Sequence, residues 1–326
     1  MNKQEIKKIE NQIFCILNGY LKKNDIVILA LSGGSDSIFL LNMLHLFSLS
    51  KKIKVIAVHI NHMLRGDESD KDEKFAENSA KNLNLGFIAK KINIKDIARK
   101  EKKGLEECGR IERYKFFKQT LKKNKAKYIF LGHHSDDNLE TIILNFTRGA
   151  GLDGLAGMQM QEQNLLRPLL YFSKAKIKDY LKTRKIKFIE DKSNKDTKFT
   201  RNFIRIKIVP LLKKINPNIA ETISANLKNL ADTNNFLQEK ADLWIQNNRI
   251  NTNTLDIKIL KKEPEIFQKI ILRRLIGHIK GNTGNIENTH IDETIELIKK
   301  NFGNKLKKFK GIKVYLKNNQ LSITLL

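Results

Sequence analysis

Short apolar runs rich in β-branched residues alternate with stretches of helical periodicity through the first part of the chain. The apolar runs cover residues 25–31, 53–60, 87–93 and 127–132, and the helical stretches between them cover about 36–49, 68–85 and 105–123. This alternation predicts an α/β fold, in which a parallel sheet carries helices on both faces. Ligands of such sheets bind beyond the carboxyl ends of the strands, so we expect the chemistry to follow each strand.

The alternation stops near residues 214–219, and we expect a domain boundary there. Isoleucines and leucines at helical spacing over residues 6–21 predict a helix ahead of the first strand. Beyond the boundary, helices are expected at about 218–248, 265–279 and 289–302, followed by short strands. We therefore predict a domain at 1–215 and a smaller, mainly helical domain at 216–326 that ends in a small β-hairpin.

The chain is strongly basic, with 62 Lys and Arg against 35 Asp and Glu in 326 residues and a formal net charge of +27. Such an excess favours an acidic partner such as RNA, although a general composition bias towards lysine explains it about equally well. No apolar run approaches the roughly 18 residues of a membrane span. The first residues lack the apolar core of a secretion signal, and two cysteines form no disulfide framework. We therefore expect a cytoplasmic protein without a membrane partner.

A glycine-rich turn follows the first apolar run. It consists of Ser32, Gly33, Gly34, Ser35, Asp36 and Ser37, and an apolar helical stretch comes next. Backbone N–H groups of a Gly-Gly turn at a helix N-terminus, together with serine hydroxyls, suit a phosphate. The turn lacks the lysine of a Walker loop, so we expect Asp36 to bind Mg²⁺ instead. The alternative is an ordinary strand-to-helix turn capped by serine.

A second polar cluster, from Gly132 to Thr141, follows the fourth apolar run. On a helix, Asp137 and Glu140 share one face, and the apolar residues from Leu139 onward form the other. Two carboxylates near His133 and His134 suit Mg²⁺ binding, deprotonation of an amine or recognition of a cation. The alternative is a solvated acidic helix start beside a core histidine.

Weaker signals come from three other places. His59 and Asn61 end the second run at the ligand edge, and we expect them to join the nucleotide-binding residues. Arg110 and Arg113 align with Glu106 on one helix face, which an ordinary surface ion-pair network also explains. Arg201 and Arg205, four residues apart, could clamp a phosphate, but a structural role is as good an explanation.

Gly149, Gly151 and Gly154 match the G-x-G-x-x-G dinucleotide pattern. The context argues against that interpretation, because a helical stretch rather than a strand precedes the glycines and no clear helix follows. A glycine-rich loop beside a substrate is a better interpretation, with a purely structural loop as the alternative.

Taken in order, these motifs resemble those of the N-type ATP pyrophosphatase (PP-loop) superfamily and, within it, the tRNA(Ile)-lysidine synthetases. The resemblance covers roughly residues 22–215. It depends on SGGSDS, HINHMLRGDES, LEECGRIERYKFF, LGHHSDDNLET, RGAGLDGLAGM, RPLL, EDKSN and TRNFIR with the following VPLL. It implies a Rossmann-like PP-loop catalytic domain of the adenine nucleotide alpha hydrolase type, followed by a tRNA-binding domain.

The resemblance also implies a ligase activity. ATP would adenylate the 2-carbonyl oxygen of the wobble cytidine in tRNA(Ile) with a CAU anticodon, releasing diphosphate. The side-chain amine of free L-lysine would then displace AMP, giving lysidine and changing codon reading from AUG to AUA. ATP and Mg²⁺ are the implied cofactors, and a homodimer is expected only by analogy with some members.

Residue roles carry over by motif. The resemblance implies that the leaving diphosphate is bound by Ser32, Gly33, Gly34, Ser35 and Ser37. It implies that Asp36 and Asp137 bind Mg²⁺ and that His133 lies near the phosphates. It also implies that lysine or cytidine is held, or the adenylate stabilised, by Glu140, Arg110, Arg113 and Arg205. Cys108-Gly109 departs from the family's small alanines, and longer members carry a further C-terminal domain that we expect this chain to lack.

Two other functions compete with this one. A tRNA thiolase of the same superfamily commonly needs paired or catalytic cysteines, whereas Cys15 and Cys108 stand far apart in the sequence. An RNA-binding protein with a silent nucleotide site is the other alternative. The presence of Asp36, Asp137 and Glu140 together argues against decay of the site.

Overall fold

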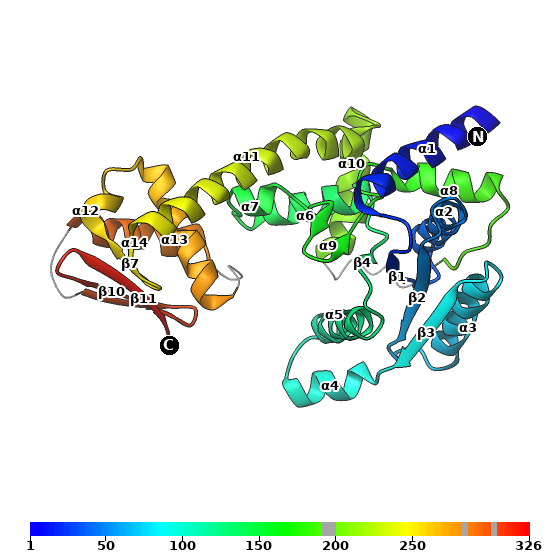
Figure 1. The fold of residues 1–326 in the computed structure, drawn as a ribbon, viewed down its shortest axis with the longest axis horizontal. Helices are drawn as coiled ribbons and strands as arrows, with labels where there is room; N and C mark the ends of the chain where they lie inside the picture. Colours follow the sequence, from blue (N-terminus) through cyan, green and yellow to red (C-terminus); the bar gives the residue numbers. More distant parts are fainter. Residues whose placement is uncertain (191–199, 282–285, 301–304) are drawn as a thin grey trace. The chain divides into compact units, whose positions relative to one another are not determined.

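The computed structural model describes residues 1–190, 200–281, 286–300 and 305–326 (Figure 1). These residues form two compact units. The first comprises Met1–Thr141 and Met158–Ala225, and the second comprises Ile142–Gly157 and Asn226–Leu326. The functional division at residue 215 stays a prediction.

A six-stranded sheet forms the centre of the first unit. Its strands are β1 (Ile26–Ala30), β2 (Lys54–Asn61), β3 (Gly86–Lys91), β4 (Tyr128–Phe130), β5 (Gln161–Glu162) and β6 (Leu165–Leu166), in the spatial order β3-β2-β1-β4-β6-β5. All neighbours pair in parallel except β5, which is antiparallel to β6. The predicted α/β fold with a largely parallel sheet is confirmed.

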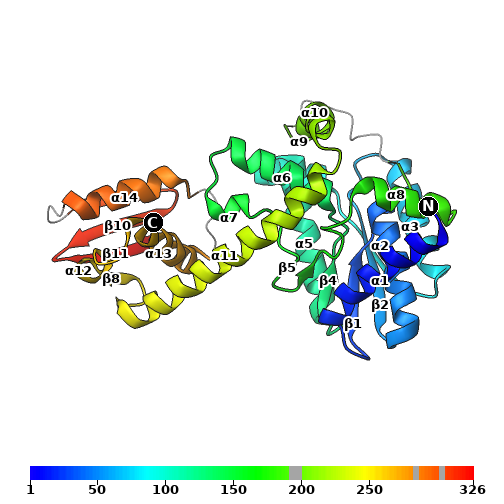
Figure 2. The ribbon, with the colours of Figure 1, turned by 90° about the horizontal axis from the view of Figure 1, so that it is seen from above.

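Helices cover both faces of this sheet (Figure 2). On one face, Val27 and Leu29 of β1 pack in a core with α1 (Lys3–Tyr20), α2 (Ser35–Lys51), α3 (Asp67–Lys81) and α8 (Lys174–Thr183). On the other face, Ile28 packs against α5 (Leu105–Lys123), which α4 (Ile94–Glu101) joins. Successive strand residues point to opposite faces, so unbroken apolar strands such as β1 supply both cores.

Four helical segments complete the first unit near the strand ends, and the last part of the first of them, from Ile142, belongs to the second unit. Helix α6 (Ser135–Thr147) begins directly after the β4 loop, and α9 (Thr200–Phe203), a π-helical turn (Ile204–Ile208) and α10 (Val209–Ile215) follow one another. A π-helical turn is uncommon and occurs frequently at functional sites. Of the motif EDKSN, residues 191–194 lie outside the described residues.

Helix α6 precedes the three glycines of the G-x-G-x-x-G pattern, and the four-residue helix α7 (Leu152–Leu155) follows Gly151. The dinucleotide-binding motif needs a strand before the glycines, so the structure agrees with its rejection. Gly149 has a φ of +69°, and its carbonyl accepts a hydrogen bond from the Asn288 side chain at 3.4 Å. Whether this loop lies beside a substrate stays a prediction.

The second unit combines helices with an antiparallel sheet. Its elements are α11 (Ile219–Asn248, which begins in the first unit), β7 (Arg249–Asn251), β8 (Thr254–Asp256), α12 (Ile257–Leu260), α13 (Glu265–Lys280), α14 (Asn288–Lys300), β9 (Lys305–Phe309), β10 (Ile312–Lys317) and β11 (Gln320–Leu325). The strands form one sheet in the order β7-β8-β11-β10-β9. The expected small hairpin is therefore part of a five-stranded sheet, because β8 pairs with β11 across the intervening helices.

None of the helices within the described ranges is both long and apolar enough to cross a membrane.

Candidate active site

The turn between β1 and α2 is held open by its own hydrogen bonds. The Ser37 hydroxyl accepts the backbone N–H groups of Ser32 and Gly33 at 3.2 Å and donates to the Gly34 carbonyl at 3.0 Å. Gly33 has a φ of +89°, and a Cβ at this position would lie 2.8 Å from Cδ1 of Ile189. Only glycine fits both the conformation and this close approach. The backbone N–H groups of this turn therefore surround a hydroxyl at the N-terminus of α2, a site suited to an anion.

The loop after β4 packs directly against this turn. A Cβ on Gly132 would lie 3.2 Å from the backbone carbonyl carbon of Asp36 and 3.2 Å from the amide nitrogen of Ser37. Glycine therefore lets the two loops touch, as expected for neighbouring parallel strands whose carboxyl ends meet at one edge. This contact places His133 and His134 beside Asp36.

A cavity of about 640 Å³ opens at these strand ends, and we call it the strand-end cavity. Seven of the predicted site residues line it: Ser32, Asp36, Ser37, His59, Asn61, Arg113 and His133. Its walls also include apolar side chains of β1, β2, α5 and β4: Ala30, Leu31, Val58, Ile60, Phe117 and Leu131. His62, Arg65, Ser69 and Asp72 line it as well, and a cavity of this volume with both apolar and polar walls is typical of a small-molecule site.

Two of the predicted nucleotide ligands already have partners in the protein. Nδ1 of His59 lies 2.8 Å from the Leu31 carbonyl oxygen, and burial lowers the pKa of this histidine. The Asn61 side chain donates to Asp70 at 2.7 Å and to Glu73 at 2.9 Å. Both side chains therefore hold β2 and the cavity wall in place, and a direct role in nucleotide binding stays a prediction.

Burial lowers the pKa of His133 and of His62 to about 4, against an ordinary value of 6.5. Within the described part of the chain, Nδ1 of each is buried and has no hydrogen-bond partner. Both rings are therefore neutral at physiological pH. A neutral His133 can hydrogen-bond a phosphate without adding charge to the cavity, and it keeps a lone pair that can accept a proton.

We expect the free energy of unfolding to fall as the pH is lowered from about 7.5 to 5.5. The folded-state pKa of His133 lies below the unfolded-state value, so between 6.5 and about 4 the unfolded chain binds more protons, and stability rises with pH across this window. Urea midpoints at several pH values measure the slope. His133→Asn is expected to flatten it, and an unchanged slope in this variant would contradict the assignment.

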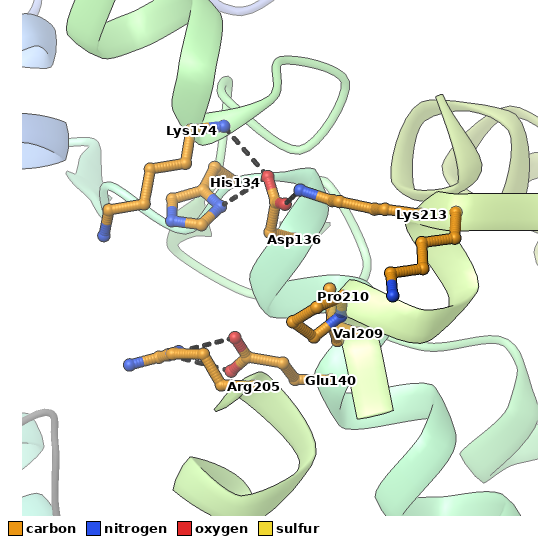
Figure 3. Close-up of a pocket in the computed structure, with 9 residues that line it drawn as sticks. His134, Asp136, Glu140, Lys174, Arg205, Val209, Pro210 and Lys213 are labelled. Carbon is orange, nitrogen blue, oxygen red and sulfur yellow. Dashed lines mark hydrogen bonds and ion pairs between the residues drawn. The ribbon is translucent and has the colours of Figure 1, made fainter. Parts of the chain in front are cut away.

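A second cavity, of about 410 Å³, lies between α6, α8 and α10, and we call it the α6 cavity (Figure 3). Its lining is rich in ionisable side chains: His134, Asp136, Glu140, Lys174, Arg205, Lys213 and Lys214, with Val209 and Pro210. The Asp136 carboxylate accepts the Lys174 backbone N–H at 2.9 Å and the Lys213 ammonium. Burial opposes ionisation of Asp136, but these two hydrogen bonds outweigh it and lower the pKa of the carboxyl group.

Glu140 is buried and binds two arginines of the segment that follows residue 199. Nε and Nη2 of Arg205 donate to its two carboxylate oxygens at 2.6 and 2.8 Å, and Nε of Arg201 donates at 3.1 Å. The hydrogen bond with Glu140 raises the pKa of Arg205. The predicted substrate residues Glu140 and Arg205 are thus brought together, and in this structure they bind each other.

Asp36 and Asp137 meet at His134, where the two cavities adjoin. Nε2 of His134 lies 3.8 Å from Asp36 Oδ2 and 3.3 Å from Asp137 Oδ2, and the Lys174 ammonium lies 3.4 Å from Asp36. Burial opposes ionisation of Asp137, but the neighbouring histidines and Arg201 outweigh it and lower its pKa. The Asp137 carboxylate is therefore ionised at neutral pH.

The carboxylates of Asp36 and Asp137 fit Mg²⁺ together with a nucleotide, but not as a site made of protein ligands alone. Among the described residues no group of three or more His, Cys, Asp or Glu side chains is arranged to hold a metal ion. Mg²⁺ is, however, usually bound by one or two carboxylates while substrate phosphates and water supply the remaining ligands. Asp36 and Asp137 are suited to that arrangement together with a nucleotide.

The structure separates two arginines that the sequence placed on one helix face. Arg113 lines the strand-end cavity, whereas Arg110 lines another cavity beside β5 and β6. Lys174 and Lys213 also belong to the site, although no sequence motif points to them. Each follows an apolar motif (RPLLYFS or VPLL), but only the tertiary fold brings their ammonium groups to Asp36 and Asp136.

Comparison with known proteins gives the family. A PP-loop domain model matches residues 2–212, which implies ATP binding. Over 98% of its length the chain is 30% identical to the tRNA(Ile)-lysidine synthase of Petrotoga mobilis, of which it covers 99%. The chain belongs to the tRNA(Ile)-lysidine synthase family. It is also 34% identical to the tRNA(Ile)-lysidine synthase of Chlorobaculum tepidum, over 75% of the chain and 72% of that relative.

Some tRNA(Ile)-lysidine synthases are longer than this chain. The sequence is 32% identical to that of Caldanaerobacter subterraneus over 88% of the chain, but it spans 62% of that relative's length. Among solved structures, the U34-tRNA thiolase NcsA from Methanococcus maripaludis matches 70% of this chain and 79% of its own, with a TM-score of 0.57 and 18% identity. At that identity the likeness shows the shared fold alone.

Proposed function

We propose that the protein attaches free L-lysine to carbon 2 of the wobble cytidine of tRNA(Ile) with a CAU anticodon, using ATP. The observation that carries the proposal is the junction of the two cavities. The strand-end cavity has both apolar and polar walls and includes Asp36 in the turn of residues 32–37, and the α6 cavity is lined by ionisable side chains that include His134. Nε2 of His134 lies 3.8 Å from Asp36 and 3.3 Å from Asp137. Membership of the tRNA(Ile)-lysidine synthase family supports the assignment.

In this proposal ATP binds in the strand-end cavity with its phosphates at the turn of residues 32–37. The 2-carbonyl oxygen of cytidine attacks the α-phosphorus, and diphosphate leaves as the adenylated cytidine forms. The N-terminus of α2 and the Lys174 ammonium, which lies 3.4 Å from Asp36, would meet the negative charge that develops on the leaving group. Mg²⁺ held by Asp36 and Asp137 would supply further neutralisation of the phosphates.

Lysine must then lose a proton from its side-chain amine before it can attack carbon 2 and displace AMP. With a reference pKa near 10.4, deprotonation at pH 7 costs about 4–5 kcal/mol, so a nearby proton acceptor is needed. Asp137 is ionised and His133 is neutral, so each has a lone pair that can take up that proton. Because the pKa of each is lowered, the proton only passes through the group and goes on to water. Glu140 can bind the incoming ammonium once its contacts with Arg201 and Arg205 loosen.

The RNA substrate fits the charge of the chain. A net charge of +27 attracts a polyanion over a long range, and binding is expected to weaken steeply with salt. A cytidine in an anticodon loop is single-stranded already, so it can enter a pocket at little cost. Formation of a homodimer and location in the cytoplasm stay predictions.

Mass spectrometry of nucleosides tests the proposed function. Unmodified tRNA(Ile) with a CAU anticodon is incubated with the protein, Mg²⁺, ATP and isotope-labelled lysine, and we expect a labelled lysine adduct on cytidine. tRNA-dependent diphosphate release without an adduct would retain adenylation but overturn lysine as the nucleophile. Absence of both signals would favour the silent RNA-binding alternative.

A further inference from the structure

A third cavity, of about 510 Å³, lies between α5 and the β4–β6 edge of the first unit, and we call it the α5 cavity. One stripe of α5 lines it, at spacings of four, four and three residues: Arg110, Tyr114, Lys118 and Leu121. The opposite wall comes from β4 and the β5–β6 hairpin: Ile129, Glu162, Gln163, Asn164, Leu165 and Arg167. None of its lining residues other than Tyr114 lines the strand-end or the α6 cavity.

The α5 cavity combines an apolar floor with a basic and amide-bearing rim. Ile129 is buried, and Leu121 and Leu165 are partly buried beneath the exposed side chains of Arg110, Lys118 and Asn164. The Arg110 guanidinium lies over the Tyr114 ring, 5.8 Å from its centroid. A flat aromatic base is well suited to such a site, because one face can contact the ring or guanidinium while phosphates meet the cations.

Arg167 adds a buried charge at the back of this cavity. Its side chain is 6% exposed, Nη2 donates to the exposed Glu162 at 2.8 Å, and Nη1 donates to the Gln159 carbonyl at 2.9 Å. Its Nε is buried and has no hydrogen-bond partner in the described part of the chain. A buried cationic donor without a partner is costly, and a bound polar ligand would satisfy it.

Tyr114 connects the α5 cavity to the reaction site. It lines both this cavity and the strand-end cavity, with Arg113 in the strand-end cavity and Arg110 in the α5 cavity. The charge of Arg167 also acts on His133, whose pKa it helps to lower after the larger effect of burial. Tyr114 would therefore separate a ligand in the α5 cavity from the target cytidine that reacts with ATP.

We infer that the α5 cavity binds a nucleotide of the substrate RNA that flanks the target cytidine. The inference rests on the proposed function, because it takes the cytidine to react at the strand-end cavity. The flanking base stacks against Tyr114 and Arg110. The side chains of Lys118 and Arg110 bind its phosphates. The Asn164 side chain and Nε of Arg167 form hydrogen bonds with the polar edge of the base. Consecutive nucleotides are then held on the two sides of one aromatic ring, which fixes the position of the target base.

Equilibrium binding of an anticodon stem-loop RNA, without ATP or lysine, tests the inference. The test variant carries both Arg110→Gln and Lys118→Gln. The control variant carries both Lys122→Gln and Lys123→Gln, which remove the same charge from the same helix but lie outside all three cavities. We expect the first variant to weaken RNA binding about tenfold and the second by less than about threefold. The affinity for ATP is expected to be unchanged in both, and circular dichroism checks that both fold.

An abasic nucleotide on either side of the target cytidine identifies the bound base. In the wild-type protein, removal of the bound base is expected to weaken RNA binding about tenfold, with little further loss in the Arg110→Gln, Lys118→Gln variant. The inference would be overturned if the two double variants weakened RNA binding equally. It would also be overturned if the loss of affinity from each abasic RNA simply added to the loss from the Arg110→Gln, Lys118→Gln variant. Loss of the lysine adduct in the wild-type protein would instead overturn the proposed function, so the two failures are distinguishable.

Discussion

Replacing Asp36 with asparagine is expected to lower the rate of lysine transfer to cytidine by about 10²–10³-fold, as loss of one preorganised charged group typically does. The Asp36 carboxylate lines the strand-end cavity and lies 3.4 Å from the Lys174 ammonium. Asparagine keeps the size of the side chain but removes the charge. It can neither neutralise Lys174 nor serve as an anionic ligand of Mg²⁺. Single-turnover formation of labelled lysidine is the measurement.

A matched control separates this effect from a general loss of charge. Asp179 lies on the exposed face of α8, and Asp179→Asn changes the net charge equally; we expect its rate to stay within about twofold of wild type, as is usual for surface changes. Asp36 is only 22% exposed, so the thermal midpoint of each variant is compared as well. A rate within tenfold of wild type in a folded Asp36→Asn protein would refute the role of this carboxylate.

The local pattern of the sequence is enough to predict most of the first unit. Strands β1 to β4 differ from the predicted runs by no more than two residues at either end, because apolar β-branched segments between helices are distinctive. The strands β5 and β6 were not predicted. Each has two residues, and they exist because Leu165 pairs with Ile129, a contact that no local pattern encodes. The second sheet was underestimated for the same reason, since β7 and β8 have three residues each.

In the candidate site too, some features can be predicted from the sequence and others cannot. The proximity of the turn at Asp36 to the loop at His133 can be predicted from the sequence, because the carboxyl ends of neighbouring parallel strands share an edge. Arg110 and Arg113 could not be told apart, since three residues on a helix differ by only about 60° in direction, and Tyr114 packs between their two cavities. The contacts of Arg205 and Lys213 with α6 join residues 65 and 77 positions apart, and only the tertiary fold makes them.

Removing the carboxylate of Glu140 is expected to destabilise the first unit. The side chain is 3% exposed and accepts hydrogen bonds from Arg205 at 2.6 and 2.8 Å and from Arg201 at 3.1 Å. In Glu140→Ala, the guanidinium groups of Arg201 and Arg205 would lose the carboxylate that both of them contact. Breaking a buried ion pair costs about 3–5 kcal/mol, and because these arginines are about one-third exposed we expect about 2–3 kcal/mol.

A double-mutant cycle distinguishes this cause from a simple packing defect. If Glu140→Ala is destabilised by repulsion between the guanidinium groups of Arg201 and Arg205 once their shared carboxylate is gone, then adding Arg205→Ala removes that repulsion. The double variant then unfolds at a higher urea concentration than the sum of the single effects predicts. Glu77→Ala, which breaks an exposed pair with Lys81, is the control and is expected to cost less than about 0.5 kcal/mol. Strict additivity of Glu140→Ala and Arg205→Ala would mean that the two side chains are not coupled, and that the π-helical segment is held to α6 by its apolar contacts instead.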